Sequence, residues 1–173
     1  MNKQLIVDLA TIDFDRVVAD IDEIRRHNPQ RYEMEQLTAI VYEDLDRNIC
    51  VGYKDTTPDD FWTRGHMPGT PLMPGVLMLE AAAQLCSYIA HRNEVLGNAI
   101  VGFGGLEEVR FRDPVFPGER LILMCEQIRS RPGRMLISRF QGIVQDSLVV
   151  EGILKGVAIP PEALKKGQSE RSD

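Results

Sequence analysis

The chain has 173 residues, a formal net charge of −6, 43% hydrophobic residues and 27% charged residues. These values predict one globular domain over residues 1–173, with a core of its own. The acidic balance argues against a broad basic surface for nucleic acid, and the N-terminal apolar island, broken by Asp8, is too short for a signal-peptide core or a membrane span.

The cysteines are few and scattered, at Cys50, Cys86 and Cys125, with no closely spaced pair. An odd number without a CxxC motif predicts neither a disulfide framework nor a metal site. Free thiols are typical of a reducing compartment, so we expect a cytoplasmic protein.

The first predicted element is a helix over residues 14–26, capped by Asp13 and stopped by Pro29. Two alternating segments follow, residues 37–44 and 48–55, which predict a β-hairpin. The residues that form the apolar face of the predicted helix are Val17, Val18, Ile21 and Ile24.

A loop rich in proline and glycine spans residues 56–74, and a long apolar helix is predicted from Gly75 to about Leu96, with Gly97 as its stop signal. Turn signals such as Gly104–Gly105 then separate predicted strands, and short connections favour neighbouring antiparallel strands. These strands cover residues 99–104, 106–115, 119–130, 134–145 and 148–159, before a polar tail over 160–173. A helix that is apolar nearly all round needs cover on every side, which a curved sheet would supply.

The polar residues of the long helix form one stripe, because Glu80, Gln84, Ser87 and His91 are spaced at i, i+4, i+7 and i+11. From Ser87 onward the stripe suits the solvated face of an amphipathic helix. Around Glu80, neighbouring alanines predict tight packing, where a carboxylate loses hydration. Such a group either pairs with a partner or works as an acid, and the helix alone leaves both interpretations open.

His66 lies at the start of a stiff segment that ends at the helix. The prolines at 68, 71 and 74 fix the backbone φ, and the glycines at 65, 69 and 75 permit unusual conformations. A loop of this kind holds a catalytic group in place, although an inert rigid linker is the alternative. His27 and His91 lie at helix ends, where structural roles suffice.

The loop ends at a helix N-terminus, where the free N–H groups of Gly75 and its successors suit an oxygen that gains negative charge. An imidazole base, an oxyanion donor and a desolvated carboxyl group would then lie together. This combination suits abstraction of a proton next to a carbonyl group, followed by loss of a β-substituent.

The stretch from Gly65 to Gln84 resembles the signature of the FabZ-type 3-hydroxyacyl-acyl-carrier-protein dehydratases, G-H-F-P-x-x-P-x-M-P-G-V-x-x-x-E-A-x-A-Q. Every fixed position matches except the phenylalanine, which is Met67 here. Pro29–Gln30–Arg31–Tyr32 is similar to the family's P-H-R-Y segment, and residues 110–119 are similar to R-F-R-x-P-V-x-P-G-D. The similarity covers about residues 20–159, which leaves 1–19 as an N-terminal extension.

This resemblance implies a hot-dog fold of the α+β class, in which a curved antiparallel sheet wraps around one central helix. It also implies a homodimer, in some cases assembled further into a hexamer as a trimer of dimers. In the family, the histidine and the glutamate of one active site come from different subunits.

Carried over to this sequence, the family roles make His66 the base that removes the C2 proton of a 3-hydroxyacyl thioester. Glu80 would protonate the departing hydroxyl group, and glutamate here favours the FabZ type over the FabA type. The N–H of Gly75 would hold the thioester oxygen, Gln84 would orient Glu80, and Met67 would line the site. No metal or other cofactor is implied, since the phosphopantetheine arm belongs to the substrate, an acyl carrier protein or CoA thioester.

Two other functions stay open on the sequence: another hot-dog thioester enzyme, such as a thioesterase or an enoyl-CoA hydratase, and a catalytically silent acyl-binding subunit. The second is favoured by residues 33–40, which depart from the apolar stretch of the family. Because acyl carrier protein is acidic, we also expect a local basic surface. Arg129, Arg131, Arg134 and Arg139 cluster around one predicted turn, as a docking surface or merely as a solvated one.

Overall fold

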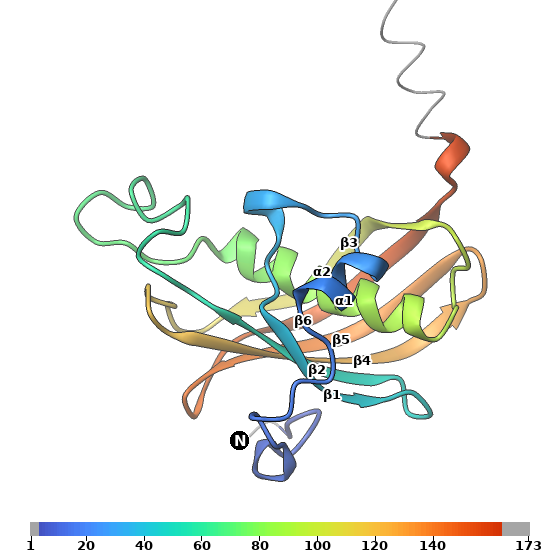
Figure 1. The fold of residues 1–173 in the computed structure, drawn as a ribbon, viewed down its shortest axis with the longest axis horizontal. Helices are drawn as coiled ribbons and strands as arrows, with labels where there is room; N and C mark the ends of the chain where they lie inside the picture. The colour runs from blue at the N-terminus through green and yellow to red at the C-terminus, as the bar shows by residue number, and fades with distance from the viewer. Residues whose placement is uncertain (1–3, 164–173) are drawn as a thin grey trace, which may run out of the picture.

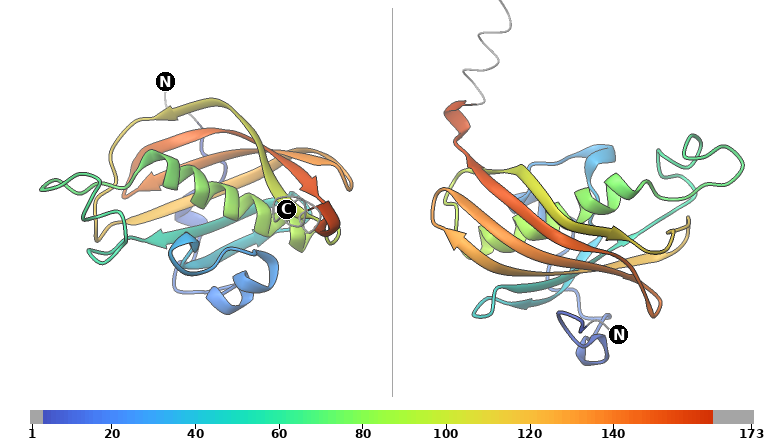
Figure 2. Two further views of the ribbon diagram at one scale, coloured as in Figure 1. Left: turned by 90° about the horizontal axis from the view of Figure 1, so that it is seen from above. Right: turned by 180° about the vertical axis from the view of Figure 1, so that it is seen from behind.

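The computed structural model describes residues 4–163 and contains one sheet of six strands, which curves around a long helix on its concave face (Figures 1 and 2). The strands run in the order β1-β2-β4-β5-β6-β3, and each neighbouring pair is antiparallel. The predicted arrangement of an antiparallel sheet wrapped around one helix is therefore confirmed. The elements are α1 (Ile21–His27), β1 (Ala39–Asp44), β2 (Ile49–Asp55), α2 (Gly75–Arg92), β3 (Ile100–Phe111), β4 (Arg120–Arg131), β5 (Met135–Val144) and β6 (Ser147–Ile159), with short 3-10 helices at Leu9–Thr11 and Tyr32–Met34.

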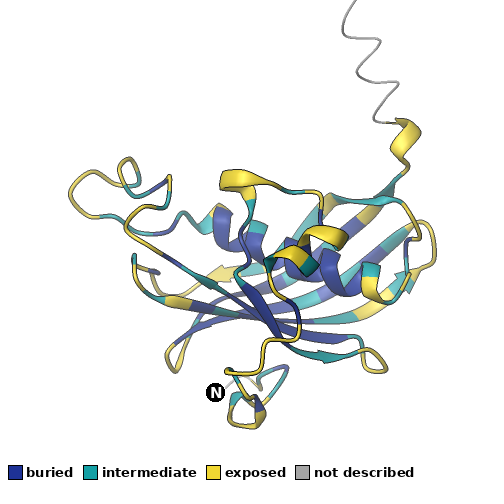
Figure 3. Cartoon of the chain, in the orientation of Figure 1, coloured by how far each residue is buried: buried dark blue, intermediate teal, exposed yellow. Residues whose placement is uncertain are grey.

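Burial along α2 explains why its sequence is so apolar (Figure 3). From Leu77 to Ala90, every residue is buried except Glu80 and Ala83, which are half-buried. Leu85 is fully buried in the same cluster as Phe140 of β5, and a leucine in this position stabilises the fold by about 1.5–3 kcal/mol. The helix is thus the centre of the core.

The predicted hairpin is confirmed as β1 and β2, which pair from Ala39–Tyr53 to Asp44–Ile49. The turn between them ends at Asn48, whose φ of 56° lies in the left-handed region that asparagine tolerates. The hairpin then adds to the sheet through β2, which pairs with β4.

The predicted helix over residues 14–26 is wrong in its first half. α1 begins only at Ile21, and its N-cap is Asp20 rather than Asp13. The side chain of Asp20 accepts a hydrogen bond of 3.0 Å from the N–H of Glu23, which satisfies one of the free donors of the first turn.

The residues before α1 pair with the edge of the sheet instead. The N–H groups of Val18 and Ala19 lie 2.8 and 3.2 Å from the carbonyl oxygen of Ile40 in β1. This pairing with a distant strand outweighs the local helical periodicity. The predicted C-terminal boundary before Pro29 is confirmed, since α1 ends at His27.

The strands predicted over residues 99–104 and 106–115 are one continuous strand, β3. The predicted turn at Gly104–Gly105 is instead an irregularity in the pairing with β6, between Phe103 and Gly105. A bulge of this kind bends a strand without ending it.

β3 also lies at the edge of the sheet beside β6, so the prediction that β3 and β4 are neighbouring strands is wrong. The connection over residues 112–119 contains Pro114 and Pro117, which cannot donate to a tight hairpin ladder. It leads to β4, which is separated from β3 by β5 and β6 in the sheet. At the start of β4, the N–H of Thr56 donates to the carbonyl of Glu119 at 3.0 Å. The short connections of β4, β5 and β6 do join neighbouring strands, as expected.

α2 ends at Arg92 rather than at the predicted Leu96. The side chain of Asn93 donates to the carbonyl of Leu45 at 3.1 Å, and Glu94 has a φ of 53°, which ends the helical geometry. Leu96 can then turn back and become buried.

The N-terminal segment covers the outer face of the sheet, on the side opposite α2 (Figure 1). Within residues 5–14, Ile6 and Ile12 are buried in an outer apolar cluster. The N–H of Ile6 donates to Oε1 of Gln141 at 2.8 Å. The extension therefore shields apolar strand residues from water. Of the predicted polar tail, residues 164–173 lie outside the described part of the chain.

Candidate active site

The loop of residues 56–74 projects from the body of the molecule beyond the N-terminal end of α2 (Figure 1). His66 is anchored there by its N–H, which donates to the carbonyl of Trp62 at 2.8 Å, and by its carbonyl, which accepts from the N–H of Leu72 at 2.9 Å. Nδ1 of the ring lies 2.8 Å from the carbonyl oxygen of Leu72. Because a carbonyl only accepts, Nδ1 carries the proton, and Nε2 holds the lone pair of a base.

The glycines of this loop do not share one role. Among the three glycines of the motif, Gly69 has a φ of 80°, whereas Gly65 and Gly75 stay outside the left-handed region. Gly69 lies in a tight turn in which Met67 and Thr70 exchange N–H···O bonds of 3.2 and 2.9 Å. The side chain of Met67 is exposed, so its place in the site stays a prediction.

Gly75 is required by a close neighbour. A Cβ atom built there would lie only 2.8 to 3.2 Å from ring atoms of Phe111 in β3. The absent side chain makes room for this ring. Within residues 4–163, the N–H groups of Gly75 and Val76 donate to no acceptor, so the helix end does present the predicted free donors.

The side chain of Gln84 contacts that of Glu80. Nε2 of Gln84 donates to Oε1 of Glu80 at 2.8 Å, one helical turn away. Gln84 is itself fixed, because Nε2 also donates to the carbonyl of Met34 at 2.6 Å and Oε1 accepts from the N–H of Gln36 at 2.9 Å. The segment that departs from the family pattern therefore contributes two backbone groups to this clamp.

A second amide reaches the same carboxylate. Nε2 of Gln30 lies 3.4 Å from Oε1 of Glu80. Sequence reasoning did not identify Gln30, since nothing local links it to a residue fifty positions away. Glu80 is half-buried in the single chain, which is less than the neighbouring alanines suggested.

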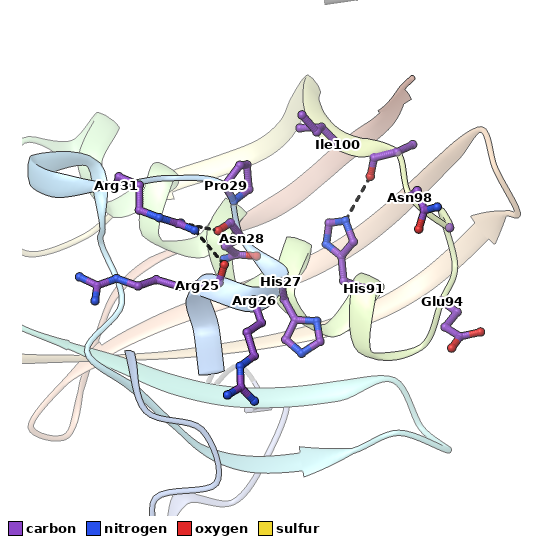
Figure 4. A pocket seen from close by; sticks show the side chains of 12 residues that line it. Arg25, Arg26, His27, Asn28, Pro29, Arg31, His91, Glu94, Asn98 and Ile100 are labelled. Atoms are coloured by element: carbon purple, nitrogen blue, oxygen red, sulfur yellow. Dashed lines mark hydrogen bonds between the residues drawn. The ribbon is translucent and has the colours of Figure 1, made fainter. Parts of the chain in front are cut away.

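The second half of the polar stripe is not a solvated face, because Ser87 is buried and His91 is half-buried. Both ring nitrogens of His91 lie near carbonyl oxygens: Nδ1 is 2.9 Å from that of Ser87 and Nε2 is 3.1 Å from that of Ala99. His91 therefore joins α2 to the segment before β3 (Figure 4).

A pocket of about 670 Å³ lies beside this second histidine, between α1, the C-terminal end of α2 and the start of β3 (Figure 4). Its guanidinium groups are engaged, since Arg25 pairs with Glu35 at 2.6 Å and Arg31 donates to backbone carbonyls. The hydrogen bond from Arg25 lowers the pKa of Glu35. None of the predicted catalytic residues lines this pocket.

The predicted docking arginines, Arg129, Arg131 and Arg134, lie at the β4–β5 turn and are exposed. The turn contacts the segment after α2, where the N–H of Gly133 donates to the carbonyl of Val95 at 3.0 Å. They are thus at the end of α2 opposite to Gly75 within one chain. Arg139 is separate, since it pairs with Glu126.

The structure places His66 and Glu80 on different supports, the projecting loop and the body of α2. Within residues 4–163, no hydrogen bond or ion pair joins the two side chains. The same part of the chain has no group of three or more His, Cys, Asp or Glu side chains arranged to hold a metal ion. It also has no helix that is long and apolar enough to cross a membrane.

Comparison with known proteins gives relatives along most of the chain. Residues 28–153 match the FabA-like domain family. The 3-hydroxyacyl-acyl-carrier-protein dehydratase FabZ of Hydrogenobaculum sp. is 38% identical over 151 residues, which are 85% of this chain and 99% of the relative. FabZ of Agrobacterium fabrum is 35% identical over 142 residues, covering 82% and 91% of the two chains.

A solved structure, the dehydratase heterocomplex ApeI:P from Xenorhabdus doucetiae, aligns with a TM-score of 0.68 and 16% identity over 83% of this chain and 95% of that one. At this identity it shows a shared fold alone. The match to the family and the near full-length relatives carry the assignment: the chain belongs to the FabA-like family and is of the FabZ type.

Proposed function

We propose that this chain dehydrates (3R)-3-hydroxyacyl thioesters of acyl carrier protein to trans-2-enoyl thioesters, a step of fatty acid biosynthesis. The names of the FabZ relatives support the reaction and its carrier. The observation that carries the mechanism is the incomplete pairing of two side chains. His66 keeps Nε2 available, and Glu80 keeps Oε2 without a donor among the described residues.

The proposed reaction is an elimination in which one proton is taken and one is given. Nε2 of His66 accepts the proton from C2 of the substrate, and the C2–H electron pair forms the C2=C3 double bond. The C3–O bond breaks as the oxygen takes a proton from Glu80 and leaves as water. A proton passing from His66 back to Glu80 restores the starting state.

Negative charge develops on the thioester oxygen while C2 loses its proton. The free N–H of Gly75 is placed at the positive end of α2, where donors aimed at such an oxygen lower the barrier. The elimination forms one C=C bond and releases water without an external oxidant or reductant, so it calls for no redox group, and the phosphopantetheine arm arrives as part of the substrate. The buried, free thiols of Cys50, Cys86 and Cys125 suit the proposed cytoplasmic location.

We expect the complete site to require a homodimer. The loop of His66 projects away from the body, and β3 ends the sheet with one row of backbone groups available to a second copy. Apolar side chains are exposed nearby, including Val76 at 71% and Phe111 at 52%. His66 of one protomer would then face Glu80 of its partner. Assembly of dimers into a hexamer stays a prediction.

The function is tested by incubating the purified chain with 3-hydroxyacyl and crotonyl thioesters while recording enoyl absorbance and free thiol. We expect reversible enoyl formation without thiol release. Thiol release would identify a thioesterase, and simple binding without turnover would identify a silent acyl-binding subunit; either result would overturn the dehydratase proposal.

The shared site is tested by complementation between two inactive variants. A heterodimer of H66A and E80Q protomers has one site with both residues intact if the site is built from two subunits, and none if it lies within one chain. Co-expression should therefore restore about one quarter of the wild-type activity in a random mixture. Mixing that restores nothing, although heterodimers are detected, would contradict the two-subunit site.

The basic β4–β5 turn is proposed as the docking surface for acyl carrier protein. Reversing the charges of Arg131 and Arg134 should raise KM for carrier-protein substrates by about 10-fold while sparing short CoA analogues, because exposed charges mainly steer association. Reversing Arg16 and Arg47, which lie elsewhere, is the matched control. Equal loss on both substrate classes would exclude docking at this turn.

A further inference from the structure

The two amides that reach Glu80 differ in how firmly they are held. Gln84 has three hydrogen bonds, to Glu80, Met34 and Gln36, so its amide cannot turn over. Among the described residues, the side chain of Gln30 makes one hydrogen-bonding contact, the 3.4 Å approach of Nε2 to Glu80. Its Oε1 is buried and has no hydrogen-bond partner among the described residues. Gln30 is therefore the adjustable member of the pair.

The orientation of Gln30 follows from the chemistry of its neighbour. A turned amide would bring its oxygen against a carboxylate oxygen, so the nitrogen must face Glu80. Both amides then donate to the same oxygen, Oε1. A proton on Glu80 is accordingly held on Oε2, the oxygen that no described residue occupies. The pair of glutamines thus selects which oxygen gives its proton away.

An unpartnered buried oxygen makes the position of Gln30 unfavourable for stability, since such a group loses its hydration without replacement. Gln30 also lines a small enclosed cavity together with Asn28 and Gln84. A shift of ~0.5 Å separates the present contact of the amide with Glu80 from an ordinary N–H···O bond.

We propose that Gln30 is a positioning residue of the dehydration: its amide closes on Oε1 as Glu80 gives up its proton, and so stabilises the carboxylate that forms. A hydrogen bond to a charged acceptor is stronger and shorter than one to a neutral acceptor, so the contact strengthens during the step and not before it. An interaction of this kind acts on kcat rather than on substrate binding. The inference rests on the proposed function.

The test compares three substitutions of Gln30 in the full-length protein. Q30M keeps the length of the side chain and removes the donor, and we expect kcat to fall about 10-fold with KM within about 2-fold of wild type. Q30H keeps an N–H donor and restores the residue of the P-H-R-Y pattern, so kcat should return to within about 3-fold of wild type. Q30E keeps the shape of glutamine but places a second carboxylate beside Glu80, and kcat should fall further than in Q30M.

The matched control is Q127M in β4, far from Glu80 along the fold, which should leave kcat and KM unchanged. Thermal unfolding of every variant separates folding defects from catalytic ones. If Q30M does not fold, the kcat of Q30E is compared with that of wild type instead. A kcat of Q30M equal to wild type, or a Q30H variant as slow as Q30M, would overturn the role of Gln30 while the dehydratase function stands. A wild-type protein without dehydratase activity would instead overturn the proposed function and this inference together.

Discussion

The two ends of α2 both carry a histidine and a glutamate nearby, but only one end leaves them incompletely paired. At the C-terminal end, Nε2 of His91 lies 3.1 Å from the carbonyl oxygen of Ala99, and Nδ1 lies 3.4 Å from the hydroxyl of Ser87, which can donate to it. Glu43 accepts from the hydroxyl of Tyr88 and pairs with Arg92. At the N-terminal end, one ring nitrogen of His66 is engaged within residues 4–163. We therefore expect the N-terminal end of α2, where a lone pair and a proton are available, to contribute to reactivity. The C-terminal end, where they are not, should contribute to stability.

The difference between the two histidines should appear as the largest effect. H66A removes the base, so kcat should fall about 10³-fold while the free energy of unfolding stays nearly unchanged. H91A removes the side chain that joins α2 to the carbonyl oxygen of Ala99, so it should lower the free energy of unfolding by about 1–2 kcal/mol and leave kcat within about 3-fold. Steady-state kinetics and urea unfolding of both variants check this, and the reverse outcome would break the comparison.

The start of α2 should be the next most sensitive position. G75A places a methyl group against the ring of Phe111, at 2.8 to 3.2 Å, so the helix start or the ring must shift. Displacing the free N–H by a few tenths of an ångström should lower kcat about 10- to 100-fold. The double variant G75A/F111L offers the methyl group more room and should recover part of the loss. Equal activities of the single and double variants would show that the ring is not the cause.

The sequence was sufficient for features that depend on nearby residues. The i, i+4 spacing of Glu80 and Gln84 placed the two side chains together, and local patterns identified α2 and the β1–β2 hairpin. It was insufficient where distant segments compete, as for Val18 and Ala19, whose pairing with β1 replaces a helical turn. The contacts of Gln30 with Glu80 and of Phe111 with Gly75 likewise join segments that no local pattern connects.

Substitutions at the C-terminal end of α2 should affect stability alone. Y88F removes the hydroxyl that donates to Glu43, so the free energy of unfolding should fall by about 1–2 kcal/mol, with kcat within about 2-fold of wild type. Y42F is the matched control, because its hydroxyl makes only a 3.5 Å contact with Asp44 and its loss should cost less than about 0.5 kcal/mol. A large loss of activity in Y88F would show that the two ends are coupled.

The smallest expected effect is a pH dependence of the free energy of unfolding, caused by the buried thiol of Cys50. Burial, followed by the nearby charge of Glu43, raises the pKa of the Cys50 thiol well above its ordinary value. The unfolded chain therefore releases this proton first as the pH rises, so the stabilisation is complete below the unfolded pKa of about 8.5 and is lost above it. Between pH 8 and pH 9 the loss should be about 0.7 kcal/mol for this thiol.

The measurement is the slope of the free energy of unfolding against pH, for the wild type and for C50A. The substitution also changes packing, so the two slopes rather than the two absolute values carry the comparison. We expect a flatter slope in C50A. The pKa of Tyr88 is raised as well, mainly by burial and then by its hydrogen bond to Glu43, but an unfolded tyrosine titrates near pH ~10. Staying below pH 9 therefore excludes the tyrosine. A hydrogen bond with Cys86 and burial also raise the pKa of the Cys125 thiol, which contributes to both slopes, so only the difference between wild type and C50A reports Cys50. Identical slopes would mean that Cys50 does not titrate differently in the folded and unfolded chains.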